Sequence, residues 1–159
     1  MTLSFDVALL TPVPFDHLQS GQRVCQTAGK VAFGSRAFET FHELDKLRNG
    51  LTVAVYIYAS HTPMPIGSQV SWQAHYIGFK PSEELPRNYE ELYRPPTTQG
   101  PADDTRDFWP FFWEVVDLQP LPTSIPIHQF SGQGRKRPYQ KNFVPEGPLL
   151  IEYPYFKIT

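Results

Sequence analysis

The chain is poor in cysteine and in long apolar runs. Cys25 is the one cysteine among 159 residues, so no disulfide can form within the chain and we expect a reducing compartment. No run of about 18 apolar residues is present that could span a membrane. Residues 1–15 also lack the basic start of a signal peptide. The sequence therefore predicts a cytoplasmic protein with no membrane partner.

Motifs for metals, nucleotides and nucleophilic catalysis are also missing. The 5 histidines share no ligand spacing and Cys25 has no partner nearby, whereas structural zinc needs four closely paired ligands. Neither the phosphate loop G-x-x-x-x-G-K-[ST] nor the nucleophile elbow G-x-S-x-G occurs. We therefore expect no metal and no cofactor, and a non-enzymatic role is favoured over catalysis.

Proline and aromatic residues are abundant. The chain has 17 prolines and an aromatic content of 14%. Proline fixes φ and removes a backbone donor, so this composition favours short strands with irregular connections over long helices. The length suits one domain over residues 1–159 with a core of its own.

Hydrophobic spacing predicts a strand pair in the middle of the chain. Residues 51–59 form a nearly continuous apolar run, which is typical of a strand covered on both faces. Residues 70–79 alternate instead, with Trp72 on the apolar face and Gln73 and His75 on the polar face. Because a short loop rich in proline and glycine joins the two runs, we expect them to pair antiparallel.

Helical signals are few. Apolar residues at helical spacing predict a helix over 37–47 that ends at Gly50, and a single helical turn is expected at 15–18. Pro12 and Pro14 are expected to end the first strand. The remaining expected strands cover residues 3–10, 30–33, 111–118 and 149–151.

Residues 81–107 form a long polar segment, for which we expect a mobile surface loop with a helical turn at 89–93. The elements on either side of it are short strands and few helices. Together they predict an α+β domain built on a small, curved or closed, mostly antiparallel β-barrel with a few short helices.

Residues 131–141, called the basic loop below, carry the strongest functional signal. Of the 14 basic residues, Arg135, Lys136, Arg137 and Lys141 lie here with no acid among them, beside two glycines and Tyr139. Backbone N–H groups, guanidinium groups and a stacking ring are the groups that hold a nucleotide. In a chain of net charge −2 this concentration predicts a local polyanion site. A solvated surface loop would explain the same charges.

Aromatic and polar side chains outside the basic loop are candidates for the same site. Trp109 precedes Pro110 at the junction of a loop and a strand, where an exposed ring would stack on a base. Trp72 is expected in the core. Gln73 and His75 would read the edge of a base, or else form the ordinary solvent-facing side of an antiparallel strand.

Three strands and the helices between them carry a family resemblance. The strands are Val31-Ala-Phe-Gly-Ser, Val53-Ala-Val-Tyr-Ile-Tyr and Phe111-Phe-Trp-Glu-Val-Val. Their order over residues 5–153 resembles the PUA-like superfamily, especially its EVE and ASCH branches. The resemblance implies a curved β-barrel with a cleft that binds RNA or modified bases in DNA.

The ASCH signature G-x-K-x-x-E-x-R is not reproduced in this chain. Gly29 and Lys30 are adjacent, and no glutamate precedes Arg36 at the required place. The ribonuclease or amidohydrolase activity of some ASCH proteins is therefore not carried over.

We expect a non-enzymatic module that binds RNA, or single-stranded or modified DNA. The basic loop would hold phosphates, while Trp109 and Tyr139 would stack on bases. One alternative is a small ASCH-like hydrolase acting on a nucleoside-like amide or RNA through Lys30, Arg36 and Glu39. Another is a protein-interaction domain that docks through the proline-rich segment 94–110 or the aromatic residues 153–156.

Overall fold

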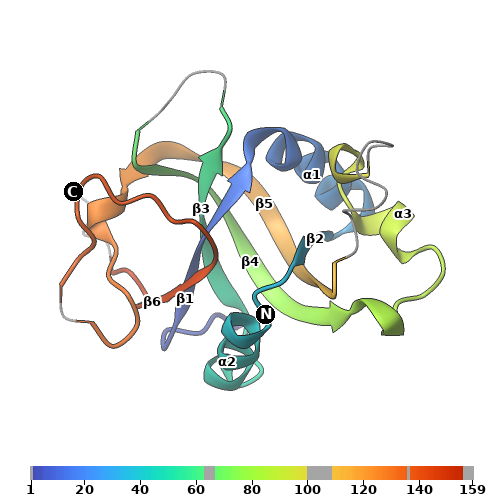
Figure 1. Cartoon of the computed structure of the whole chain (residues 1–159), viewed down its shortest axis with the longest axis horizontal. Helices are drawn as coiled ribbons and strands as arrows, with labels where there is room; N and C mark the ends of the chain where they lie inside the picture. The colour runs from blue at the N-terminus through green and yellow to red at the C-terminus, as the bar shows by residue number, and fades with distance from the viewer. Residues whose placement is uncertain (1, 63–66, 100–108, 136, 156–159) are drawn as a thin grey trace.

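The computed structural model describes residues 2–62, 67–99, 109–135 and 137–155. They form strands and helices around one curved sheet (Figure 1). The strands are β1 (Ala8–Pro14), β2 (Val31–Ser35), β3 (Val53–Ser60), β4 (Gln69–Pro81), β5 (Phe111–Pro126) and β6 (Leu149–Ile151). The helices are α1 (Phe15–Ala28), α2 (Phe38–Arg48) and α3 (Tyr89–Tyr93), with 3-10 turns η1 (Ser82–Glu84), η2 (Pro96–Thr98) and η4 (Ile127–Gln129). Within these ranges no helix is long and apolar enough to cross a bilayer.

The six-stranded sheet runs in the order β2-β5-β4-β3-β1-β6. β1 and β3 are parallel, and the other neighbouring strands are antiparallel, including the expected pair β3 and β4. Register shifts along β4 and β5 introduce bulges that bend the sheet. The predicted α+β class with a mostly antiparallel sheet is therefore confirmed. The sheet is not closed into a barrel, because no ladder joins β1 to β2 within the described residues.

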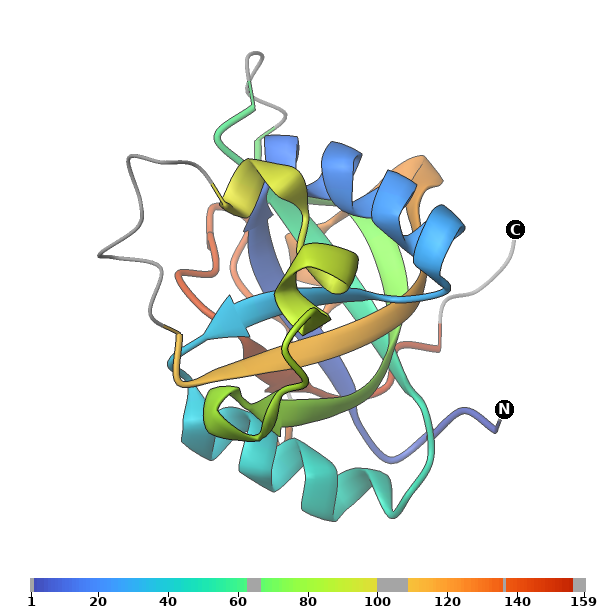
Figure 2. The same ribbon diagram turned by 90° about the vertical axis from the view of Figure 1, so that its right-hand side faces the viewer.

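Both faces of the sheet are covered. On β1, Leu9 faces the main core with α1 and α2, whereas Leu10 faces a second core beneath residues 127–153. Figure 2 shows α1 and α2 at opposite ends of the curled strands. A third, smaller cluster joins β2 and β5 to Tyr89 of α3. The central strands are thus buried on both faces, as their nearly continuous apolar sequences predict.

The prolines of β1 mark a free edge. Contrary to the expectation that they end the strand, Pro12 and Pro14 lie within β1 and stay in parallel register with β3. β6 pairs with Ala8–Leu10, so among the described residues Thr11–Pro14 have no strand on their other side. Proline is tolerated there because its missing N–H removes no ladder bond.

Helix α1 departs most from the sequence prediction. A single turn is expected at 15–18, but α1 extends over 14 residues. Its buried Gly21 packs closely on the sheet, since a Cβ there would come within 3.3 Å of Leu118 and Phe33. The helix has no side-chain cap and much of its surface is polar, so tertiary packing rather than local spacing defines it.

Helix α2 agrees with the prediction over 37–47. It buries Phe41 and Leu44 in the main core. Asn49 ends the helix in the left-handed conformation, with φ 53°, just before Gly50. The basic last turn, with Lys46 and Arg48, also suits the negative end of the helix dipole.

Residues 82–98, within the expected long polar loop, include η1, α3 and η2, and Tyr89 packs on the sheet. The predicted helical turn at 89–93 is present as α3. Tyr89 and Arg94 are 2% and 5% exposed, which is unusual for such a polar segment. The other part of the expected loop, residues 100–108, lies outside the described residues.

Arg94 ties η2 to α3. Its guanidinium donates to Glu90 Oε1 at 2.8 Å and to the carbonyl oxygen of Thr98 at 2.5 Å. The same group lies over the ring of Phe112, 5.3 Å from its centroid. A buried arginine satisfied in this way fixes the segment between α3 and the end of η2.

Glu114 holds α3 against the outer face of β5. Its buried carboxylate accepts hydrogen bonds from Tyr89 Oη at 2.5 Å and from Lys30 Nζ at 2.8 Å. The Lys30 ammonium also lies over the Tyr93 ring, 4.7 Å from the centroid. Burial and the bond to Glu114 raise the pKa of the Tyr89 phenol above its ordinary value. The phenol is therefore a neutral donor at physiological pH.

Replacing Tyr89 with phenylalanine removes one of the two donors to Glu114. Because the lost bond is to a charged acceptor, we expect the free energy of unfolding to fall by about 1.5–3 kcal/mol. Denaturant unfolding should show a lower midpoint with an unchanged slope. Tyr155→Phe, at an exposed tyrosine, should leave the midpoint unchanged. Equal midpoints for Tyr89→Phe and the parent would contradict the role of this bond.

Candidate functional site

A pocket of about 400 Å³ lies where the curved sheet stays open. Its walls come from the free edge of β1, the first turn of α1, the end of β2 and η2. These strands stand far apart in the sheet order, so curvature of the sheet brings them together. The lining residues are Thr11, Pro12, Val13, Pro14, His17, Phe33, Gly34, Ser35, Thr97, Thr98, Trp109, Trp113 and Pro148. We call this the Trp109 pocket.

Trp109 forms one wall of the pocket against Gly34. A Cβ at Gly34 would lie 2.2, 2.3 and 2.7 Å from three atoms of the Trp109 ring, so only glycine fits beneath it. The Arg36 guanidinium lies 5.3 Å from the ring centroid. Ser82 Oγ donates a hydrogen bond to the Trp109 carbonyl oxygen. Side chain and main chain of Trp109 are therefore both held in place.

The pocket combines an apolar lining with a few polar groups. Phe33 and Trp113 are buried residues of the main core that also line the pocket. Among the polar groups, Thr97 Oγ1 lies 2.8 Å from both His17 Nδ1 and Ser20 Oγ. These hydrogen bonds link α1 to η2. A flat, largely apolar ligand with polar edges suits such a lining.

The basic loop borders a second, wider hollow of about 1040 Å³. Arg135, Arg137 and Tyr139 line it together with Phe143. The rings of Tyr139 and Phe143 are stacked, with centroids 4.5 Å apart and an interplanar angle of 10°. Burial raises the pKa of the Tyr139 phenol, although the nearby Arg135 opposes this. We call this region the loop hollow.

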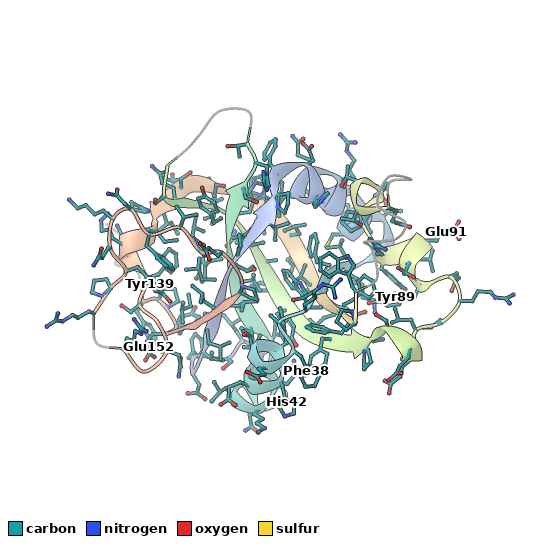
Figure 3. The ribbon with its side chains drawn as sticks, in the orientation of Figure 1. Phe38, His42, Tyr89, Glu91, Tyr139 and Glu152 are labelled. Carbon is teal, nitrogen blue, oxygen red and sulfur yellow. The ribbon has the colours of Figure 1, made fainter. Side chains whose placement is uncertain are left out.

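Hydrogen bonds from the main chain attach the basic loop to the segment around β6. Gln133 N–H donates to the carbonyl oxygen of Leu150 at 3.0 Å, and Gly134 N–H donates to Glu152 Oε1 at 2.8 Å. The Glu152 carboxylate thus accepts a hydrogen bond from one backbone N–H group of the loop. Figure 3 shows Tyr139 and Glu152 on this C-terminal part of the molecule. Lys136 lies outside the described residues.

The predicted phosphate and stacking groups therefore lie in two hollows and not in one. Trp109 lines the first, whereas Arg135, Arg137 and Tyr139 line the second. The hollows share no lining residue among those described, although Pro148 lines the first and Leu149, the next residue in the chain, lines the second. Lys141 is exposed on the basic loop itself.

Gln73 and His75 lie elsewhere. Both are on β4, and neither belongs to the described lining of the Trp109 pocket or the loop hollow. His75 Nδ1 lies 3.1 Å from Asp117 Oδ2 of β5 on a partly exposed surface. Their predicted role as readers of a base edge stays a prediction. The ordinary solvent-facing side of the strand explains them, and Trp72 is buried as expected.

The residues of the hydrolase alternative are also separated. Lys30 precedes β2 and Arg36 follows it, a distance of roughly 20 Å along an extended strand. Lys30 is paired with the buried Glu114, while Glu39 is exposed on α2. Among the described residues no three His, Cys, Asp or Glu side chains come together to hold a metal ion.

The segments of the protein-interaction alternative are only partly described. Within 94–110, residues 94–99 are packed on α3 and 100–108 lie outside the described residues. In the aromatic tail, Tyr153 and Tyr155 lie against Phe5, with ring centroids 4.8 and 6.4 Å away. Phe156 is not among the described residues.

Most of the lining of the Trp109 pocket has no signal in the sequence. Thr11–Pro14, Thr97 and Pro148 match no motif, and they come together only through the curvature of the sheet. Gly34 is the exception, since a glycine late in a strand often marks a close approach of another group. Comparisons with protein-family models, with curated proteins and with solved structures gave no match. The resemblance to the PUA-like superfamily therefore stays a prediction.

Gly34→Ala should remove the Trp109 wall of the pocket without changing any polar group. A methyl group at this position overlaps the indole, so the ring must move off β2. Trp72 and Trp113 are buried, so increased quenching of tryptophan fluorescence by acrylamide would report Trp109. Gly147→Ala is the matched control, because no atom lies within 4 Å of the added methyl group. Unchanged quenching in Gly34→Ala would contradict the close packing.

Proposed function

We propose that the protein binds single-stranded nucleic acid and holds one unpaired base in the Trp109 pocket. The observation that carries this proposal is the fixed indole of Trp109 at the side of an apolar pocket. A separate hollow lined by Arg135 and Arg137 offers contacts to phosphates. Stacking on an aromatic ring and neutralisation of phosphates are the two contributions on which such binding depends.

The size of the pocket supports a single base as its ligand. At about 400 Å³ it lies near the lower end of small-molecule sites, which span roughly 300–1,000 Å³. A base within a duplex is stacked on both sides and cannot enter a pocket of this kind without being extruded. Unpaired bases avoid that cost. We therefore infer a preference for single strands.

The charge distribution supports phosphate contacts at the basic loop. The chain as a whole has net charge −2, so its attraction for a polyanion must be local. Arg135, Arg137 and Lys141 are exposed on the loop, next to the stacked pair Tyr139 and Phe143. Pro148 of the Trp109 pocket precedes Leu149 of the loop hollow along the chain, and a bound strand would have to be long enough to reach from the pocket to these cations.

Two variants test the proposal by titration of labelled oligonucleotides at two or more salt concentrations. Trp109→Ala should weaken binding by about 5- to 100-fold, the loss expected for one stacked base. Replacing Arg135, Lys136 and Arg137 by glutamine should weaken binding of all sequences. It should also reduce the slope of log affinity against log salt by up to about 2, or about 0.7 for each phosphate contact.

The matched control neutralises three exposed cations elsewhere, Arg23, Lys46 and Arg87. Because its net charge equals that of the basic-loop variant, it separates local contacts from the overall charge. RNA, DNA, base-modified and duplex oligonucleotides form the arms of the titration and identify the preferred ligand. If the parent protein binds none of them at low salt, or if both triple variants lose affinity equally, the proposal fails.

A further inference from the structure

Phe38 is an exposed aromatic residue on a rigid helix. It lies in the first turn of α2 and is 52% exposed, whereas the other phenylalanine of this helix, Phe41, is fully buried. Figure 3 shows Phe38 and His42 projecting together from α2. An exposed aromatic ring can serve as a stacking surface for a base.

Neighbouring rings fix the orientation of Phe38. The His42 ring is nearly parallel to it, with centroids 5.5 Å apart and an interplanar angle of 13°. Phe79 and Phe111 meet it edge to face, at centroid distances of 6.0 and 6.1 Å. A ring that is already ordered loses little conformational entropy when a ligand stacks on it.

Phe38 is connected to the Trp109 pocket through Arg36. Phe38 N–H donates to the Arg36 carbonyl oxygen at 2.9 Å, and the Arg36 guanidinium packs on the Trp109 ring. Ser35, the residue before Arg36, lines the pocket and pairs with Phe111, the residue against which Phe38 packs. The exposed ring therefore lies on the β2–α2 side of the pocket, away from the basic loop.

We propose that Phe38 is a second stacking platform, for a base adjacent to the one held in the Trp109 pocket. This inference rests on the proposed function and adds a direction to it: the strand leaves the pocket past Arg36 and continues over α2. Arg36 is exposed, and its guanidinium packs on the Trp109 ring two residues before Phe38 in the chain.

The charges around Phe38 are mixed. Arg36 and Lys80 are exposed cations on this side, whereas Glu39 follows Phe38 on α2 and is exposed as well. Stacking rather than phosphate attraction must therefore supply most of the contact with Phe38. Binding at this platform should depend less on salt than binding at the basic loop.

The test compares Phe38→Ala with the parent protein on a length series of single-stranded oligonucleotides, from a mononucleotide to eight nucleotides. We expect an unchanged affinity for the mononucleotide. For strands of about three nucleotides or more we expect a loss of about 5- to 100-fold, as for one stacked base. Phe38→Trp should restore binding. Leu92→Ala, at an exposed leucine of α3, is the control and should bind like the parent.

The outcomes separate this inference from the proposed function. If the parent binds the longer strands and Trp109→Ala weakens them, but Phe38→Ala binds like the parent, only the second platform is overturned. The same follows if Phe38→Ala weakens the mononucleotide as much as the longer strands. If sedimentation shows that Phe38→Ala converts a dimer into a monomer, Phe38 is instead a contact between copies of the chain. If the parent binds no strand, both proposals are overturned.

Discussion

The strands β1 and β2 approach each other across the curled sheet but remain unpaired within the described residues. Pro12 and Pro14 provide no N–H groups on the β1 side. On the β2 side, the Trp109 ring lies over the face of the strand at Gly34. The pocket therefore lies at the gap between β1 and β2, and residues of both strands line it. A complete ladder at this point would close the barrel and remove the pocket.

The position of η2, which lines the Trp109 pocket, depends on polar interactions outside the pocket. Glu114 holds Tyr89 of α3, and Arg94 links α3 to the carbonyl oxygen of Thr98. Thr97 then bonds to His17 of α1. This chain of polar contacts, buried at Glu114 and exposed at Thr97, helps to place η2. The stability of the fold and the shape of the pocket thus depend on the same groups.

The spacing of apolar residues predicted correctly those elements whose fold depends on a regular pattern within the element itself. The alternation of residues 70–79 and the helical spacing of 37–47 gave β4 and α2, because each buries one face in a regular way. α1 could not be read in this manner, since its contact with the sheet depends on a glycine that lets the helix approach. The sequence predicted a curved or closed sheet and left closure open, because closure at the β1–β2 gap depends on curvature and not on the propensity of any residue. The basic loop was recognisable from composition, but its separation from Trp109 depends on the path of residues 143–150.

The one thiol of the chain lies within the helix that frames the pocket. Cys25 is buried against the main core, two turns after His17. A thiol reagent can reach it only when α1 lifts from the sheet, so the rate of alkylation measures the free energy of that local opening. A ligand held in the Trp109 pocket, which His17 of α1 lines, adds its own binding free energy to the opening. The alkylation rate of Cys25 therefore reports whether the Trp109 pocket is occupied, and no amino-acid substitution is needed to measure it.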